Sequence, residues 1–211
     1  MRQPDPKRNI EGDAGYARHY VATHEQTTVG LPYRLEYSDL CILDSLLDEG
    51  YALLDVGCGT AGYHRLLKRH GRVVGLDFSS EMIAAAKELA VRFETRNCDY
   101  VAGTWEDYRP PEPFDGIAFA SIYGWYRSWR GAQDVMNRLA GMLKPDGLLI
   151  LSYVHPTTPF NWLKAWCLGE RTMCLPESEF RAMLAKAGLK EVLTLNKPHT
   201  RVCFAQKTAT G

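Results

Sequence analysis

The residues best suited to chemistry lie in a short stretch from Leu53 to Tyr63, with the sequence LLDVGCGTAGY. An apolar strand is expected to run directly into the glycine spacing of Gly57, Gly59 and Gly62. Glycines at such a turn let the backbone bend sharply and approach a ligand, and a helical pattern follows whose positive end could meet an anionic group. The spacing alone is weak evidence, because dinucleotide-binding enzymes use it too.

The carboxylate of Asp55, two positions before Gly57, discriminates between possible ligands. A carboxylate at the end of a strand repels a pyrophosphate, but it accepts hydrogen bonds from an ammonium group or from backbone amides. These residues therefore predict a ligand that carries an amino-acid part rather than a diphosphate.

A second acidic residue, Asp77, ends the apolar run Val73–Asp77 and lies 20 positions after Gly57. A carboxylate at this place can accept hydrogen bonds from both hydroxyls of a ribose. Ser79 or Ser80 is expected to cap the helix that follows, whose alanine content favours helix formation.

Four segments, in this order, resemble the motifs of the class I S-adenosylmethionine-dependent methyltransferases. They are LLDVGCGTAG from Leu53, GLDFSSEMIAAAK from Gly75, FDGIAFAS from Phe114 and LKPDGLLIL from Leu143. Together they extend over roughly residues 53–153. The resemblance implies methyl transfer with S-adenosyl-L-methionine as the cofactor.

The same resemblance implies which residues bind the cofactor. The first acid and the loop glycines should face the methionine part and the ribose, and the second acid should bind the ribose hydroxyls. Side chains after the second strand should flank the adenine, although for Met82 a place in the core is nearly as well supported. The implied cofactor residues are Asp55, Gly57, Gly59, Asp77, Phe78, Met82, Thr104, Trp105, Ala120 and Tyr16.

The chain departs from the family pattern after the third strand. Where the family often has Gly-Asp-Ala, with the acid bonding the adenine amino group, this chain has Gly103-Thr104-Trp105. The hydroxyl of Thr104 can accept that bond, Trp105 can stack on the ring, and Glu106 or Asp107 can replace the missing acid. The adenine contact therefore stays open between these residues.

The acceptor is expected near two segments that follow strands four and five, where ligands of parallel sheets bind. These segments are rich in aromatic side chains, which suit a small planar or cationic acceptor but can equally pack an inserted segment onto the sheet. The candidate acceptor-binding residues are Tyr123, Trp125, Tyr126, Trp162 and Trp166.

Three residues are candidates for the catalytic group that deprotonates the acceptor. His155 follows the fifth strand and can titrate near neutral pH, although His-Pro-Thr also suits a turn. Tyr20 and His19 belong to an N-terminal segment that covers the site in enzymes of this family. His24, His64 and His70 are expected at the surface. His155 with Cys167 and Cys174 has no convincing zinc-ligand spacing, so no metal is expected.

Bulk properties exclude several function classes. The 211 residues include 25 basic and 25 acidic side chains with zero formal net charge, so no broad positive face for nucleic acid is expected. No apolar run is long enough to cross a membrane. We therefore expect no membrane span and no secretory signal, and we expect the six scattered cysteines to be reduced. We expect a cytoplasmic enzyme that works as a monomer or homodimer.

Alternating strand and helix patterns predict a seven-stranded, mainly parallel sheet with helices on both faces and an antiparallel last strand. The strands are expected at 52–56, 73–77, 99–102, 114–121, 148–154, 191–195 and 201–205. Helices are expected around 62–70, from 81 onward, at 132–143 and from Pro176 to Gly188. An amphipathic helix that contains Leu40, Leu43, Leu46 and Leu47 should precede the first strand.

We expect one methyltransferase domain over residues 1–211, with an N-terminal cap at 13–35 and an inserted lid at 155–174. The predicted function is methyl transfer to an oxygen or nitrogen atom of a small molecule in an aromatic-lined pocket. The sequence shows no Asn-Pro-Pro-Tyr motif, which marks methylation of planar amide or base nitrogens. Two alternatives remain: a nicotinamide-dependent oxidoreductase with the same glycine loop, and a cofactor-binding partner subunit without catalysis.

Overall fold

The computed structural model describes residues 31–119, 129–153, 176–197 and 201–208. Its seven strands form a sheet in the order β3-β2-β1-β4-β5-β7-β6. Strand β2 runs parallel to β1 and β3, and β4 runs parallel to β5, whereas β7 runs antiparallel to both β5 and β6. The predicted seven-stranded, mainly parallel sheet with an antiparallel last strand is therefore confirmed. The chain divides into two compact units, residues 1–108 and 109–211.

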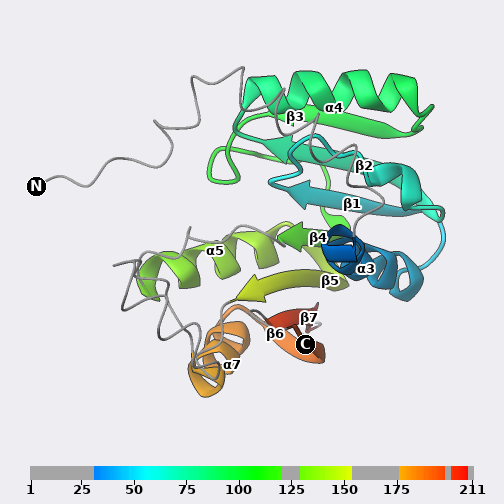
Figure 1. Ribbon diagram of the computed structural model, residues 1–211. Helices are drawn as coiled ribbons and strands as arrows, with labels where there is room; N and C mark the ends of the chain where they lie inside the picture. Colours follow the sequence, from blue (N-terminus) through cyan, green and yellow to red (C-terminus); the bar gives the residue numbers. More distant parts are fainter. Residues whose placement is uncertain (1–30, 120–128, 154–175, 198–200, 209–211) are drawn as a thin grey trace, which may run out of the picture. The chain divides into compact units, whose positions relative to one another are not determined.

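In the first unit, strands β1, β2 and β3 lie side by side, and helix α4 runs along β2 and β3 (Figure 1). Strand β1 and the second half of β2 are buried, as apolar runs inside a parallel sheet require, and Leu53 of β1 pairs with Val73 of β2. In the edge strand β3 only Tyr100 is buried. The elements of this unit are α3 (Leu31–Leu46), β1 (Tyr51–Val56), the 3₁₀ helix η2 (His64–Leu66), β2 (His70–Asp77), α4 (Ser80–Arg92) and β3 (Cys98–Ala102).

The prediction of a helix at 62–70 is wrong. Only the three-residue η2 forms there, and Leu67 is already extended with φ −73° and ψ 122°. The carboxylate of Asp44, on α3, accepts the backbone N–H groups of Lys68 (3.5 Å) and Arg69 (3.2 Å), which a continuing helix would have bonded internally. Side-chain capture of this kind competes with helix formation. A single 3₁₀ turn also has no appreciable macrodipole, so the predicted attraction of an anionic group does not apply.

Gly71, the residue that follows the predicted helix, is part of β2. A Cβ atom at Gly71 would lie 2.4 Å from the carbonyl oxygen of Gly50. Glycine is required here because two backbone segments approach closely, and not because a helix ends.

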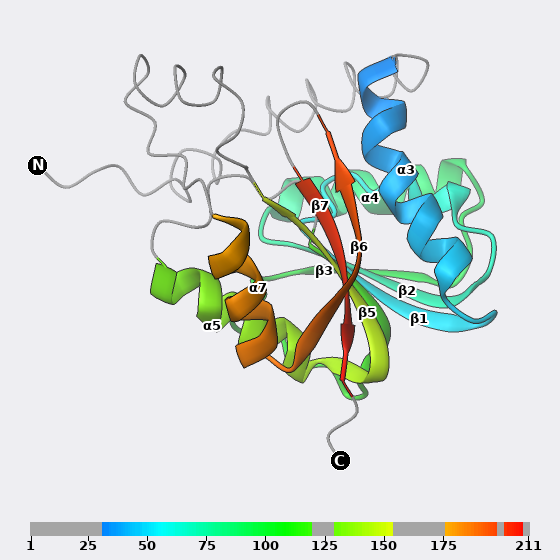
Figure 2. The ribbon, with the colours of Figure 1, turned by 90° about the horizontal axis from the view of Figure 1, so that it is seen from below.

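The second unit contains β4 and β5 as a parallel pair and β7 between β5 and the edge strand β6. Helices α5 and α7 lie side by side (Figure 2), and the side-chain amide of Gln133 donates to the carbonyl of Met183 at 3.1 Å. Strand β5 begins earlier than predicted because Leu143 already pairs with Phe114. The elements are β4 (Phe114–Phe119), α5 (Trp129–Gly141), β5 (Leu143–Tyr153), α7 (Glu177–Lys186), β6 (Leu189–Asn196) and β7 (Arg201–Lys207).

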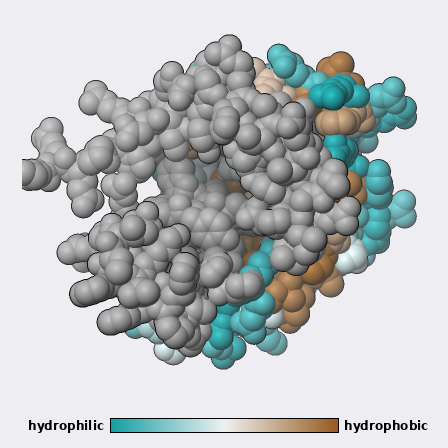
Figure 3. Space-filling model, viewed as in Figure 1, coloured by the Kyte–Doolittle hydropathy of each residue, from teal (hydrophilic) through white to brown (hydrophobic). Residues whose placement is uncertain are grey.

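The surface of the described residues mixes hydrophilic and hydrophobic side chains, as the coloured part of Figure 3 shows. Exposed large apolar side chains are spread over several elements: Leu46, Leu66, Val91, Val192 and Leu193. Leu40, Leu43 and Leu47 are buried, as the amphipathic pattern predicts. Leu46 was expected on the same apolar face, but its side chain is exposed. Within the ranges described, no helix has the length and apolar character needed to span a membrane.

Candidate cofactor site

The glycine loop follows β1 and is anchored on the end of β2. The backbone N–H groups of Gly57 and Cys58 donate to the carbonyl of Leu76 at 2.7 and 3.2 Å. Gly57 and Gly59 have φ values of 77° and 55°, in the left-handed region that glycine adopts without strain. A Cβ atom on Gly59 would find nothing within 4 Å. The loop therefore leaves open space at the position where a ligand is predicted.

The third glycine of the spacing has a smaller role than predicted. Ala61, not Gly62, takes the left-handed conformation, with φ 51°. A Cβ atom on Gly62 would only touch Leu89 at 3.7 Å, which is an ordinary contact. The turn thus depends on Gly57 and Gly59.

Asp77, at the end of β2, binds the loop through its carboxylate. Its Oδ2 accepts the N–H of Gly59 at 2.9 Å, and its Oδ1 accepts the N–H of Ser79 at 2.9 Å. Ser79 in turn caps α4, because its hydroxyl accepts the N–H of Met82 at 3.2 Å. Burial raises the pKa of Asp77 above its ordinary value, while the two backbone hydrogen bonds oppose that shift. An ionised carboxylate has about four acceptor positions, so two remain for ligand hydroxyls.

Asp55, on β1, is 4% exposed and holds two donors on one oxygen. The hydroxyl of Tyr63 and the ring Nε2 of His64, at 3.0 Å, both meet Oδ2. Among the described residues no hydrogen bond to Oδ1 is formed. One oxygen of this carboxylate is therefore committed to the protein, and the other can accept a ligand donor.

The two carboxylates give the loop region a negative electrostatic potential. The thiol of Cys58 lies between them in sequence, and its pKa is raised well above the ordinary value by burial and by the charges of Asp55 and Asp77. The same field that disfavours a thiolate favours a cationic ligand group, such as an ammonium or a sulfonium. The site therefore fits the amino-acid part and the positive charge of S-adenosylmethionine.

The residues predicted around the adenine have different surroundings. Phe78 is half-buried, whereas Met82 is buried on α4 and belongs to the core of that helix. The Thr104 hydroxyl donates to the carboxylate of Asp107 at 2.9 Å and accepts its N–H at 3.3 Å, which commits part of its capacity to a local turn. The ring Nε1 of Trp105 is buried and has no partner among the described residues.

His64 is the residue that the sequence reasoning missed. It was expected at the surface, but it is fully buried, since η2 turns it back beneath the end of β1 onto Asp55. Its ring stacks on Tyr100 with centroids 5.7 Å apart and planes 10° apart, and Tyr63 meets it edge-on at 5.0 Å. The only available clue was its place directly after the glycine loop.

All the predicted acceptor-binding and catalytic residues lie outside the described part of the chain: His19, Tyr20, Tyr123, Trp125, Tyr126, His155, Trp162 and Trp166. Two of the predicted cofactor residues, Tyr16 and Ala120, lie there as well. The lid predicted at 155–174 and most of the N-terminal cap lie there too. Within the residues that the structure does describe, no group of three or more His, Cys, Asp or Glu side chains could hold a metal ion.

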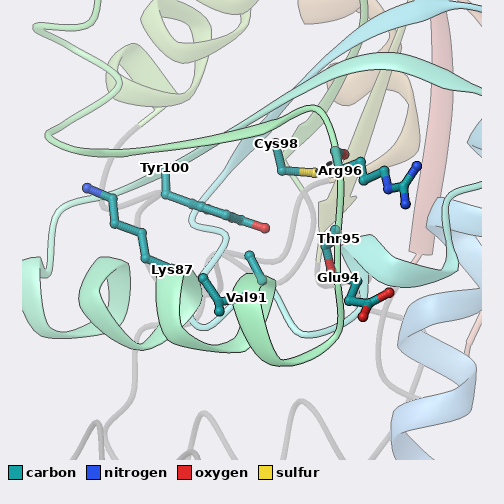
Figure 4. A pocket seen from close by; sticks show the side chains of 8 residues that line it. Lys87, Val91, Glu94, Thr95, Arg96, Cys98 and Tyr100 are labelled. Carbon is teal, nitrogen blue, oxygen red and sulfur yellow. Dashed lines mark hydrogen bonds between the residues drawn. The ribbon is translucent and has the colours of Figure 1, made fainter.

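A surface hollow of about 570 Å³ lies between the second half of α4 and the start of β3 (Figure 4). Lys87 and Val91 line it from α4, and Cys98 and Tyr100 from β3. Its lining includes Thr95, Arg96 and Cys98, at the amino end of β3, whereas the glycine loop follows the carboxyl end of β1 and Asp77 ends β2. The hollow is therefore separate from the candidate cofactor site.

Residues 53–147 match the family model described as "Methyltransferase domain". Over 117 residues the chain is 35% identical to a ubiquinone biosynthesis O-methyltransferase of Bradyrhizobium diazoefficiens, covering 54% of this chain and 42% of that protein. Over 133 residues it is 32% identical to a 2-phytyl-1,4-naphtoquinone methyltransferase of Thermosynechococcus vestitus, covering 59% of this chain and 56% of that protein. The chain thus spans about half the length of these curated relatives.

Solved structures share the fold. The N-methyltransferase NodS of Bradyrhizobium japonicum superposes with a TM-score of 0.65 at 17% identity, covering 85% of this chain and 99% of that one. Magnesium protoporphyrin IX methyltransferase of Synechocystis, solved with bound S-adenosylhomocysteine, gives a TM-score of 0.65 at 16% identity and covers 99% and 90%. At these identities the likeness concerns the fold alone.

Proposed function

We propose that this chain is a class I S-adenosylmethionine-dependent methyltransferase, which transfers a methyl group from S-adenosyl-L-methionine to an oxygen or nitrogen atom of a small molecule; its match to the methyltransferase domain supports this. One observation carries the proposal. Two buried carboxylates, Asp55 and Asp77, flank a glycine loop that leaves open space at Gly59. A pyrophosphate would be repelled there, whereas an amino acid joined to a ribose matches both acids.

When bound, the cofactor supplies an electrophilic methyl group on a sulfonium. Asp55 accepts the ammonium of the methionine part, and the free acceptor positions of Asp77 receive the ribose hydroxyls. Phe78 contributes to the adenine side, together with Thr104 or Trp105. The protein then has to orient the acceptor atom opposite the leaving sulfur, and positioning of this kind supplies much of the rate.

We assign acceptor binding to the aromatic side chains after β4 and β5, with His155, Tyr20 or His19 as the base. Curated relatives that share this domain are named for methylation of quinone-type small molecules, which supports a small acceptor.

Titration calorimetry with S-adenosylhomocysteine tests the proposal. We expect binding at sub-millimolar concentration, and mass action should stabilise the protein by about 2.7 kcal/mol at one hundred times Kd. NAD⁺ and NADH serve as matched ligands, because the alternative oxidoreductase would bind them instead. Absence of heat with S-adenosylhomocysteine in a folded sample contradicts the proposal. Cofactor binding without turnover over a panel of phenol, quinol and amine acceptors would favour the non-catalytic subunit.

A further inference from the structure

His64 is buried next to the proposed cofactor site, and its side chain is not exposed to the space in which a ligand would bind. It is 0% exposed, its Nε2 lies 3.0 Å from Oδ2 of Asp55, and it comes from the single turn η2. Two aromatic rings fix its orientation, Tyr100 by stacking and Tyr63 from its edge. Such a residue can act on a ligand only through Asp55.

The hydrogen-bond pattern assigns the tautomer of His64. Tyr63 and His64 meet the same oxygen of Asp55, which suits an ionised carboxylate that only accepts. The proton of the imidazole is therefore on Nε2. The other ring nitrogen, Nδ1, is buried and has no partner among the described residues, as is tolerable for a lone pair and costly for an N–H group. His64 is thus a fixed donor to Asp55.

Two donors on Oδ2 constrain the whole carboxylate. Because both bonds end on one oxygen, they set the rotation of the Asp55 side chain and leave Oδ1 as its acceptor for a ligand. We infer that His64, assisted by Tyr63, is a positioning residue that directs Oδ1 of Asp55 toward the ammonium group of the cofactor. The inference rests on the proposed function and adds a specificity element to it, since the ammonium distinguishes the amino-acid part from the rest of the ligand.

The arrangement also explains how a loop without a long helix keeps its shape. The backbone hydrogen bonds described for η2 are all short-range: from His64 to Ala61 (3.0 Å), from Leu66 to Tyr63 (2.8 Å) and from Leu67 to His64 (3.1 Å). The side-chain bonds from Tyr63 and His64 then tie this turn to β1. The same contacts therefore position Asp55 and anchor the turn.

The test compares two ligands that share adenosine and a thioether sulfur. S-adenosylhomocysteine carries the ammonium, whereas 5′-methylthioadenosine lacks the amino-acid part. His64→Phe keeps a ring against Tyr100 and removes the donor, His64→Gln restores a donor nitrogen, and Tyr63→Phe removes the second donor. We expect His64→Phe to weaken S-adenosylhomocysteine about tenfold, the scale of a hydrogen bond to a charged group, and to leave 5′-methylthioadenosine within about twofold. His64→Gln should recover part of the loss.

The outcomes distinguish a positioning role of His64 from a purely structural one. A selective loss for S-adenosylhomocysteine supports positioning, and retained binding of 5′-methylthioadenosine shows at the same time that the variant is folded. Equal weakening of both ligands shows that His64 only supports the fold, and no change in either also overturns the inference. If His64→Phe does not fold, Tyr63→Phe, at a partly buried position, must show the selective loss by itself. Failure of the unmodified protein to bind either ligand removes the proposed function, and this inference with it.

Discussion

Individual residues in the first unit serve both the fold and the proposed ligand. Asp77 illustrates this, because its two oxygens accept the backbone N–H groups of Gly59 and Ser79 before any ligand is present. The sequence predicted only the ribose contact. The structure adds that the same carboxylate connects the glycine loop with the start of α4.

Asp77→Ala should therefore have two effects. Affinity for S-adenosylhomocysteine should fall by about 1.5–3 kcal/mol, the range for hydrogen bonds to a charged group, and the free energy of unfolding should fall as well, by about 1–3 kcal/mol for each backbone donor left unpaired. Calorimetry and urea unfolding measure the two. Asp99→Ala, at an exposed ion pair with Arg72, is the control and should change neither appreciably. Unchanged affinity in Asp77→Ala would place the ribose elsewhere.

The raised pKa of Asp77 gives a pH dependence. Ligand hydroxyls donate to the ionised carboxylate, so the affinity should be highest above the raised pKa and should fall as the pH drops through it. This decrease should occur at a higher pH than the ordinary pKa of 3.8 would give. The stability of the protein without ligand depends on pH in the opposite direction. The folded state binds this proton more tightly than the unfolded chain, so the penalty from Asp77 appears as the pH rises through the raised pKa.

Calorimetry with S-adenosylhomocysteine over a pH series checks this prediction. In Asp77→Asn the acid-side decrease should be absent, because the side chain no longer titrates. Parallel acid-side profiles in the two proteins would show that another group is responsible.

At the scale of elements, strand β2 has to pass very close to the glycine loop. A Cβ atom on Gly75 would lie 2.9 Å from both the sulfur of Cys58 and the ring of Tyr100. These two side chains belong to one buried cluster with Ile83 of α4. The absence of a side chain at Gly75 therefore sets the distance between β2 and the elements that carry the site.

Gly75→Ala should lower the free energy of unfolding by about 1–3 kcal/mol, as overpacking of a core does, and should weaken S-adenosylhomocysteine by displacing Cys58 in the loop. The matched control is Gly103→Ala, whose Cβ would meet only Leu76 at 3.7 Å. Urea unfolding and calorimetry on both variants make the comparison. Equal effects of the two substitutions would contradict the packing argument.

Helix α7 is joined to the start of β7 by ion pairs. Glu177 meets Arg201 at 2.6 Å and Arg181 at 2.7 Å, and the hydrogen bond from Arg201 is the main cause that lowers the pKa of Glu177 below its ordinary value. A carboxylate with a lowered pKa in the folded state stabilises the protein above its unfolded pKa, here about 4.5, and loses that contribution as the pH falls through the folded pKa.

Glu177→Gln should therefore destabilise the protein at neutral pH, and the difference from the unmodified protein should disappear in acid. Glu179→Gln is a close control, because Glu179 lies in the same first turn and thus has the same relation to the helix dipole. Urea unfolding at neutral and acid pH measures the effect. A difference that persists in acid would show that packing and not charge is involved.

At the scale of the whole molecule, the two halves of the proposed reaction depend on different stretches of sequence. The cofactor residues described above lie in residues 53–105, whereas the aromatic acceptor candidates lie in residues 123–126 and 162–166. Trp162 and Trp166 are one helical turn apart in sequence, so they are expected on one face of a helix.

Replacing Trp162 and Trp166 together by alanine should leave S-adenosylhomocysteine affinity unchanged and reduce methyl transfer to the acceptor. Calorimetry and a turnover assay separate the two quantities. If the double variant instead changes the oligomeric state in light scattering and keeps full turnover, the apolar face covers a second subunit and not the acceptor.

The sequence by itself determined the features that depend on neighbouring residues. Four features follow from patterns within about twenty residues: the apolar run before Gly57, a serine cap at Ser79 or Ser80, the acid at the end of β2, and the succession of strands along the chain. Family resemblance added the identity of the cofactor. These features could be predicted because local backbone preferences and apolar periodicity operate without tertiary contacts.

Only the tertiary structure decided how the loop after Gly57 continues. The predicted helix is lost because Asp44, 24 and 25 positions before Lys68 and Arg69, captures their amides. His64 is buried and bound to Asp55 because the resulting short turn folds back under β1. Neither contact leaves a periodic pattern in the sequence, since each is a single side-chain bond between elements that only folding brings together.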